Sequence, residues 1–508
     1  MRFPRAAGIL LHPTSLPGRY GIGELGKSAF HFIDLLSECG QSIWQILPLG
    51  PTGYGDSPYA CFSSMAGNPL LIDLDLLAQE GDVDPTDLKN APHFPDQAVD
   101  FGPVITYKTA VLKCAAQCFR QHTTGKSQQA FDNFVADNAH WLEDYALFIA
   151  LKDFHDGAVW NTWEKPLMMH QPDALAAWRE RLDTEIFAQR YFQFRFFQQW
   201  EALKQYANQQ NIRIVGDIPI FVAYDSVDVW ANPELYYLDK NLLPTRVAGV
   251  PPDYFSETGQ LWGNPLYRWD VMEKRGYDWW INRFEHTLRT VDIIRLDHFR
   301  GFAAYWAVPA GEPNAVNGQW EPGPGASFFE VLRQQLGELP IIAEDLGHMT
   351  PDVALLRDSF ELPGMNILQF AFASDSGNPY LPHNLSANSV IYTGTHDNDT
   401  TIGWVQTREE EEAQALNAYI GPTNEPVHWA LIRTAFRSVA DSAIIPMQDI
   451  LGLGTEARMN TPGKLGGNWI WRFRLDDVRD EDCKRLKAIT VTYGRQVNIK
   501  QQKRPDWM

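Results

Sequence analysis

Three acidic residues lie just beyond the ends of three separate apolar segments. They are Asp297 in DIIRLDHFRG, Glu344 in PIIAEDLG and Asp397 in SVIYTGTHDND. Each segment is short, rich in β-branched residues and followed by turn-forming residues, which is typical of a buried parallel strand that ends in a loop. Carboxyl groups that different strands bring to one rim can act as nucleophile and general acid, and the commonest such chemistry is cleavage of a glycosidic bond.

The first two segments also supply the surroundings that this chemistry needs. Arg295 shares a strand face with Asp297, and a guanidinium keeps a neighbouring carboxylate ionised, as a nucleophile requires. A structural ion pair at a strand end explains the same two residues equally well. Glu344 follows an apolar run and stands beside other acids, which favours its protonated form and suits a general acid. The alternative is an ordinary acid before a helix start, a role that Asp345 could also fill.

The third segment pairs His396 with Asp397 in a polar loop. A polar donor and a carboxylate together can bind sugar hydroxyls and favour a positively charged transition state, although turn formation by Asp and Asn explains the pattern as well. Asp217, in IRIVGDIPIFV, holds the same relative place in a fourth strand. Four acids at four strand ends are hard to explain as independent ion pairs, so together they indicate one site.

Aromatic residues in segments rich in Gly and Pro are candidate platforms for sugar rings. The apolar C–H faces of a sugar stack on indole and phenol rings, and such segments do not readily enter a core. The candidates are Tyr54 and Tyr59 in PTGYGDSPYA, Trp262 in QLWGNP, and Trp469 with Asn468 in KLGGNWIW.

Eight apolar segments must position these residues. They are GILLHP, SIWQILPLG, IRIVGDIPIFV, VDIIRLDHF, PIIAEDLG, MNILQFAF, SVIYTGTHD and AIIPMQDILG. Amphipathic helical patterns alternate with them, for example at 27–39, 327–336, 351–360, 425–440 and 479–493. This alternation predicts an α/β fold, a (β/α)8 TIM barrel, with a doubly wound open sheet as the main alternative.

The spacing of the strands predicts one catalytic barrel over residues 1–508 with two insertions. Residues 60–210, between the second and third strands, carry helical periodicity and predict an inserted helical subdomain. Residues 224–272, between the third and fourth strands, are rich in Pro, Gly, Trp and Tyr and predict a long structured loop, used as a lid or binding wall above the barrel mouth.

The composition disfavours several function classes. A formal net charge of −20 over 508 residues repels phosphate backbones and anionic membranes, and no run approaches the ~18 apolar residues of a membrane span. The five cysteines (Cys39, Cys61, Cys114, Cys118 and Cys483) are odd in number and lack CxxC spacing. We therefore expect reduced thiols, small apolar packing at Cys114 and Cys118, no signal peptide and a cytoplasmic location.

Long motifs along nearly the whole chain resemble the 4-α-glucanotransferase family, also called amylomaltases or disproportionating enzymes, which is related to α-amylases. The motifs are RAAGILLHPTSLPG, YGDSPYACFSSMAGNP, GDIPIFVAYDSVDVW, GVPPDYFSETGQLWGNP, DIIRLDHFRGF, IIAEDLG, YTGTHDNDT, and ARMNTPG followed by GNWIWRF. The resemblance implies Asp297 as nucleophile, Glu344 as acid/base and Asp397 as transition-state stabiliser. It implies substrate binding by Tyr54, Asp217, Asp253, Trp262, Arg295, His396 and Asn468.

The implied activity is retaining transfer of a 1,4-α-glucan segment from a maltooligosaccharide to the 4-hydroxyl of an acceptor glucan or glucose. The resemblance implies a covalent glycosyl-enzyme, starch-type α-glucans as partners, and no cofactor or metal. We expect a monomer or weak homodimer. Three alternatives stay open: an amylase-like α-glucan hydrolase, a metal-dependent barrel hydrolase that uses the same Asp and His residues, and a noncatalytic glycan-binding protein.

Overall fold

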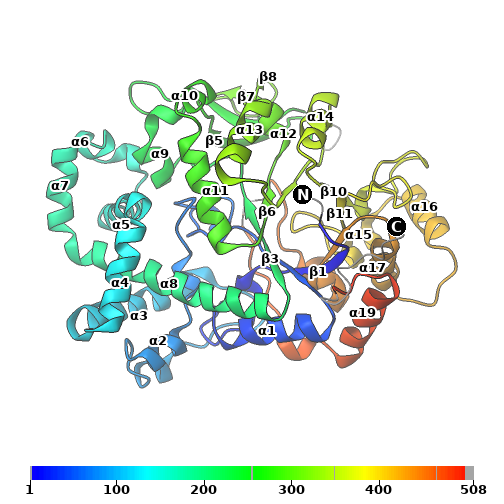
Figure 1. Ribbon diagram of the computed structural model, residues 1–508, viewed down its shortest axis with the longest axis horizontal. Coiled ribbons are helices and arrows are strands. Elements are labelled where there is room, and N and C mark those ends of the chain that lie inside the picture. The colour runs from blue at the N-terminus through cyan, green and yellow to red at the C-terminus, as the bar shows by residue number, and fades with distance from the viewer. Residues whose placement is uncertain (1–2, 253–255, 348, 465, 498–508) are drawn as a thin grey trace.

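Eight parallel strands close into a barrel at the centre of the molecule (Figure 1). The structure is a computed structural model that describes residues 3–252, 256–347, 349–464 and 466–497. In chain order the barrel strands are β1 (Ala6–Leu10), β2 (Ile43–Gln45), β3 (Arg213–Ile218), β6 (Ile293–Leu296), β9 (Ile341–Ala343), β10 (Gly364–Ile367), β11 (Ser389–Tyr392) and β12 (Ser442–Pro446). Each overlaps one of the eight predicted segments, so the predicted (β/α)8 barrel is confirmed.

The barrel closes where its first strand pairs with its last. β1 and β12 run parallel, with Ala6 opposite Ser442. Below this seam the fully buried guanidinium of Arg495 donates hydrogen bonds to the carbonyl oxygens of Ala6, Phe436 and Asp441. One side chain thus bridges the start of β1, the residue before β12 and the end of α17 (Val427–Arg437), and adds a charged donor to their buried carbonyl oxygens.

Helices surround the barrel at the predicted places. They are α1 (Lys27–Glu38), α11 (Asp278–Thr290), α13 (Gly325–Leu336), α14 (Pro351–Ser359), α17 (Val427–Arg437) and α19 (Asp480–Thr492). In α1 the buried residues Ala29, Phe32, Ile33 and Leu36 recur every three or four positions, so one apolar stripe faces the strands. No helix within the described residues is long and apolar enough to cross a bilayer.

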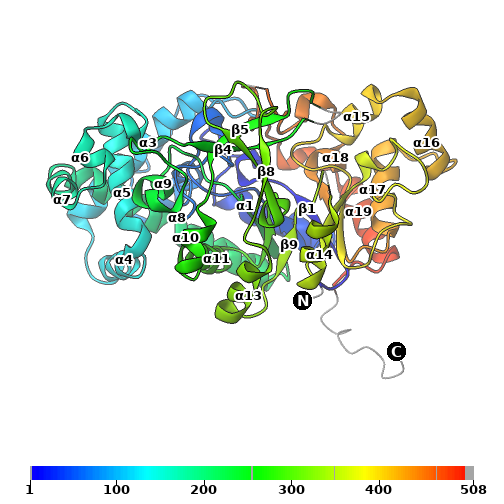
Figure 2. The same cartoon turned by 90° about the horizontal axis from the view of Figure 1, so that it is seen from above.

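The connection from β2 to β3 carries a block of helices on one side of the barrel (Figures 1 and 2). It contains α2 (Leu74–Glu80), α3 (Phe101–His122), α4 (Lys126–Asp137), α5 (Ala139–Phe154), α6 (Lys165–Met168), α7 (Pro172–Arg181) and α8 (Asp183–Gln209). Phe119, Phe131 and Phe194 pack together where α3, α4 and α8 meet. The predicted division of this block as a subdomain at 60–210 stays a prediction.

A second, four-stranded antiparallel sheet lies beside the barrel strands and was not predicted. Its order is β5-β4-β7-β8, with β4 (Arg246–Val250), β5 (Gln260–Pro265), β7 (Ala304–Pro309) and β8 (Gln319–Pro322). Sequence reasoning missed it because its strands are short, contain Gly and Pro, and come from two separate segments. Two of the strands lie in 224–272, and the use of that segment as a lid stays a prediction.

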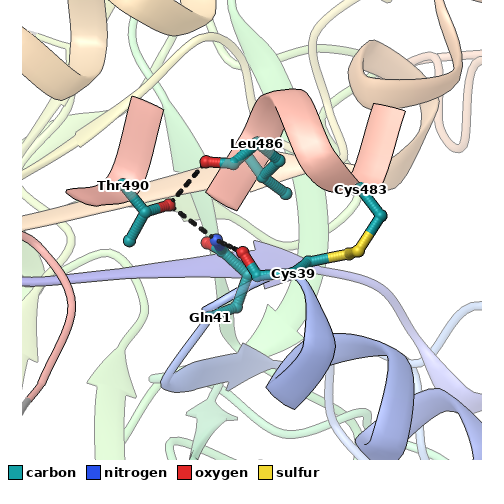
Figure 3. The surroundings of a disulfide bond; sticks show 5 residues. All are labelled: Cys39, Gln41, Cys483, Leu486 and Thr490. Carbon is teal, nitrogen blue, oxygen red and sulfur yellow. Dashed lines mark hydrogen bonds between the residues drawn. A yellow bond between two sulfur atoms is a disulfide. The ribbon is translucent and has the colours of Figure 1, made fainter. Parts of the chain in front are cut away.

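Two cysteines are joined by a disulfide bond that the sequence did not predict (Figure 3). Cys39 follows α1 and Cys483 lies in α19, with their Cα atoms 4.8 Å apart. The expectation of reduced thiols is therefore wrong for this pair, because a sequence separation of 444 residues hides the proximity of the first and last barrel helices. Cys114 is exposed rather than packed in the core, which corrects the expectation for that residue.

Candidate active site

Arg295 joins two of the predicted acids at the C-terminal ends of neighbouring strands. Its Nη1 lies 2.6 Å from Oδ2 of Asp217, at the end of β3, and 2.9 Å from Oδ1 of Asp297, just after β6. Arg295 is buried, whereas the Asp297 side chain is partly exposed. The guanidinium therefore supports Asp297 from the protein side and leaves part of the carboxylate open to the cleft.

Asp217 lies beneath the rim rather than on its surface. Its side chain is fully buried, and Oδ2 also accepts a hydrogen bond of 2.7 Å from the hydroxyl of Tyr59. Burial raises the pKa of Asp217 to about 7, against the opposing effect of Arg295. The predicted contact of Asp217 with substrate stays a prediction, and its described contacts orient Arg295 and Tyr59.

Glu344 follows β9 and accepts two backbone hydrogen bonds. The N–H of His298 donates to Oε2 at 2.7 Å, and the N–H of Leu346 donates to Oε1 at 3.0 Å. Burial, followed by the negative charge of Asp297, raises the pKa of Glu344 to about 8. Desolvation outweighs the two hydrogen bonds and the charge of Arg295, so Glu344 is mostly protonated at neutral pH and able to give a proton.

The backbone at His298 links the two strand ends. His298 has a φ of 49°, an uncommon conformation for a residue with a side chain, and it directly follows Asp297. In this conformation its N–H reaches Glu344. Strained backbone of this kind is concentrated at functional sites, where it fixes the relative placement of groups. Here it ties the acid after β9 to the acid after β6.

Asp345, the alternative to Glu344, has a different role. Its buried carboxylate accepts hydrogen bonds from Arg357 at 2.5 Å and from the N–H of Met365 at 2.8 Å. These bonds connect the end of β9 with α14 and β10. Asp345 is therefore a structural acid, whereas Glu344 is bound by the residue after Asp297 and interacts electrostatically with Asp297 itself.

Asp397 lies in the loop after β11 and is held mainly by side chains. Asn460 Nδ2 donates to Oδ1 at 2.6 Å, and His396 Nε2 lies 3.4 Å from Oδ2. Arg458 donates to the carbonyl oxygen of Asp397 at 2.6 Å. Sequence reasoning did not single out Arg458 and Asn460, because they follow Asp397 by about 60 residues and no local pattern connects them. The carboxylate is about half exposed.

Three rings form a wall beside Asp397. His396 stacks on Tyr59 with ring centroids 5.1 Å apart, and Trp469 lies 6.0 Å from both rings. Trp469 is only 6% exposed, so the interpretation of this residue as an open platform is wrong. Its ring packs between the loop and the barrel and supports His396 and Tyr59.

The remaining candidates lie on the outer parts of the site. Tyr54 is 79% exposed, and Trp262 is 39% exposed with its ring 4.8 Å from that of His298. Asn468 uses its side chain within its own loop, accepting from the N–H of Thr461 and donating to the carbonyl of Lys464. Substrate contacts of these residues stay predictions. Asp253 falls outside the described residues.

Among the described residues, no group of three or more His, Cys, Asp or Glu side chains is placed to hold a metal ion. The charged groups that converge on the opening are Asp297, Glu344 and Asp397, supported by Arg295 from below. A carboxylate nucleophile beside a carboxylic acid that can donate a proton, as Asp297 and Glu344 are placed, suits acid-assisted displacement at a sugar carbon.

Comparisons with known proteins agree with this chemistry. The sequence profile of a family described as 4-alpha-glucanotransferase matches residues 11–476. A 4-alpha-glucanotransferase from Synechocystis sp. is 54% identical over 497 residues, which cover 97% of this chain and 98% of the relative. One from Thermus thermophilus is 50% identical over 503 residues, covering 97% and 100%. The amylomaltase from Streptococcus agalactiae, solved in complex with acarbose, superposes with a TM-score of 0.94 at 39% identity and covers 97% of this chain and 99% of its own.

Proposed function

Because the chain belongs to the 4-alpha-glucanotransferase family, we propose that Asp297, Glu344 and Asp397 carry out a retaining glucan transfer. Family membership confirms the predicted 4-α-glucanotransferase activity and favours it over the α-glucan hydrolase alternative. The observation that supports the division of roles is the contrast between Glu344, whose pKa burial raises to about 8, and Asp297, which is paired with Arg295.

The first half-reaction breaks the donor glucan. Asp297 attacks the anomeric carbon while Glu344 gives its proton to the glycosidic oxygen, which leaves with the shortened chain. A covalent glycosyl-enzyme remains on Asp297. Arg295 places its positive charge beside Asp297, and the exposed carboxylate of Asp397 stabilises the positive charge that develops on the sugar ring.

The second half-reaction transfers the sugar to an acceptor. Glu344, now ionised, removes the proton from the 4-hydroxyl of an incoming glucan, and the oxygen of that hydroxyl displaces Asp297. The anomeric configuration is retained because the carbon is inverted twice. At the end of the second half-reaction Glu344 carries a proton and Asp297 is a free carboxylate again, so the proton balance closes within these two residues.

The substrates that we propose are maltooligosaccharides and starch-type α-glucans, which are neutral and match a site with few cationic groups at its opening. Trp262 and Tyr54 are partly or largely exposed and present rings on which sugar faces stack. Segment 224–272 forms a wall of the site, so that an acceptor sugar rather than water reaches the glycosyl-enzyme. We further propose a cytoplasmic enzyme that is a monomer or a weak homodimer.

Incubation with maltotriose tests this function. Transfer produces glucose together with a ladder of longer maltooligosaccharides, whereas hydrolysis yields only shorter products. The matched control is Asp297→Asn, which keeps the shape of the side chain and removes the nucleophile. Shorter products alone, or full turnover by the control variant, would reject the proposal.

A further inference from the structure

Two histidines that are distant in sequence line one small cavity beside the loop that carries Asp397. His12 follows β1, and His396 immediately precedes Asp397; each is 6% exposed. The cavity measures about 20 Å³, room for about one water molecule, and is also lined by Gln448, Asp449 and Arg458. Tyr59, whose ring stacks on that of His396, is not among the residues that line it.

Both imidazoles are neutral and leave a buried nitrogen without a partner. Burial lowers the pKa of His12 to about 3 and also lowers the pKa of His396, and their nearness disfavours charge on His12 further. The Nδ1 atoms of both residues are buried and have no hydrogen-bond partner among the described residues. A neutral imidazole has one N–H and one bare nitrogen, so each ring must adopt one of two tautomers.

The contact with Asp397 favours one of the two tautomers of His396. Its Nε2 lies 3.4 Å from Oδ2 of Asp397, and an ionised carboxylate only accepts hydrogen bonds. A proton on Nε2 of His396 is therefore favoured, because it places an N–H rather than a lone pair toward Oδ2 of Asp397. Its Nδ1 is then a bare acceptor, and a buried acceptor needs a donor.

Three other polar side chains that line the cavity have hydrogen-bond partners elsewhere. Arg458 donates to the carbonyls of Asn460 and Asp397, and Gln448 donates to the carbonyl of Ala457. Asp449 accepts from Thr393 and Thr401 and has no proton to give when ionised. His12 also lines the cavity, and its buried Nδ1 has no partner among the described residues, so it can supply the donor.

We propose that His12 is a positioning residue for the transferase reaction. Its Nδ1–H donates to a water held in the cavity, and this water donates to Nδ1 of His396. The relay fixes the Nε2–H tautomer that faces Asp397 and thereby orients the carboxylate that stabilises the transition state. The inference rests on the proposed function of Asp397 and adds a residue outside the substrate-contacting set.

Paired substitutions at position 12 test the relay. His12→Phe keeps the ring volume and removes the donor, so we expect kcat for maltotriose disproportionation to fall about tenfold, the effect of one buried hydrogen bond, with KM changed less than about twofold. His12→Asn retains an N–H donor and is expected to keep kcat within about threefold of the wild type. Equal losses in both variants, or full kcat in His12→Phe, would overturn the relay.

The tautomer itself can be read in the unmutated protein, which keeps the test independent of variant folding. Nitrogen NMR of the full chain labelled with ¹⁵N-histidine, with the His396 signals assigned by their loss in His396→Gln, is expected to show the proton on Nε2. A proton on Nδ1 of His396 would refute the proposal. If maltotriose gives no longer products, the proposed function fails; if the ladder forms and His12 has no effect, only the relay fails.

Discussion

The acids at the strand ends and the acid in the loop after β11 are held in place by different means. Asp297 and Glu344 follow barrel strands, and Glu344 is fixed by two backbone N–H groups. Asp397 lies beyond its strand and depends on the side chains of Asn460 and His396. The barrel backbone therefore sets the spacing of the two bond-making groups, whereas the position of the third acid is set by a distant segment of chain.

Because of this difference, we expect the strand-end acids and the loop acid to respond differently when their neighbours are substituted. A group fixed by backbone keeps its place when neighbouring side chains change, because the strand register does not depend on them. A group fixed by side chains loses its orientation when either partner is removed. The effect of a substitution on kcat should therefore depend on how the acid concerned is held in place as well as on its chemical role.

Removing the nucleophile should have the largest effect. Asp297→Asn is expected to lower kcat on the order of 10⁴-fold or more, because no other carboxylate at the rim is placed to form the covalent intermediate. Steady-state transfer from maltotriose measures the loss. Glu330→Gln, on the outer helix α13, is the matched control and should leave kcat unchanged; a mild effect of Asp297→Asn would remove Asp297 from its role.

Removing the proton donor should cost less. Glu344→Gln is expected to lower kcat about 10² to 10⁴-fold with maltotriose, the range for loss of general acid catalysis. An α-glucosyl fluoride donor has a leaving group that needs little protonation, so its use should recover much of the first half-reaction. An equal deficit with both donors would contradict the assignment of Glu344 as the acid.

Removing the side-chain support of Asp397 should have an intermediate effect. Asn460→Ala deletes a hydrogen bond to a carboxylate, worth about 1.5–3 kcal/mol, and is expected to lower kcat about 10 to 100-fold with the fold intact. Asn133→Ala on exposed α4 controls for the substitution. If Asn460→Ala matched the wild type, the loop acid would not depend on side-chain support.

A rise in pH should produce the smallest and most gradual effect. The pKa of Glu344 is raised to about 8, so its acid form is present below that pH and is lost above it. We expect kcat/KM to fall as pH rises through about 8, by roughly tenfold for each further unit. A pH profile that stays flat to pH 9 while the protein remains folded would show that protonated Glu344 is not required.

The contrast between support from the local backbone and support from distant side chains also explains which features could be predicted from the sequence. The eight barrel strands and the acids at their ends were visible because apolar β-branched runs and the residues after them are local patterns. Arg458 and Asn460 were not identified, since only folding brings them to Asp397. The small antiparallel sheet was missed for the same reason, and Trp469 was misread because a Gly-rich segment can still place one ring in the core.

The bond between Cys39 and Cys483 makes a covalent ring that contains every barrel strand except β1 (Figure 3). A protease that cuts a surface loop inside this ring, such as one among the inserted helices, leaves both fragments on one molecule. The two fragments then stay at a high effective concentration and can re-form the fold without first meeting by diffusion. A single cut should thus show on a gel only after reduction, and the cut protein should retain its shape until that bond is opened.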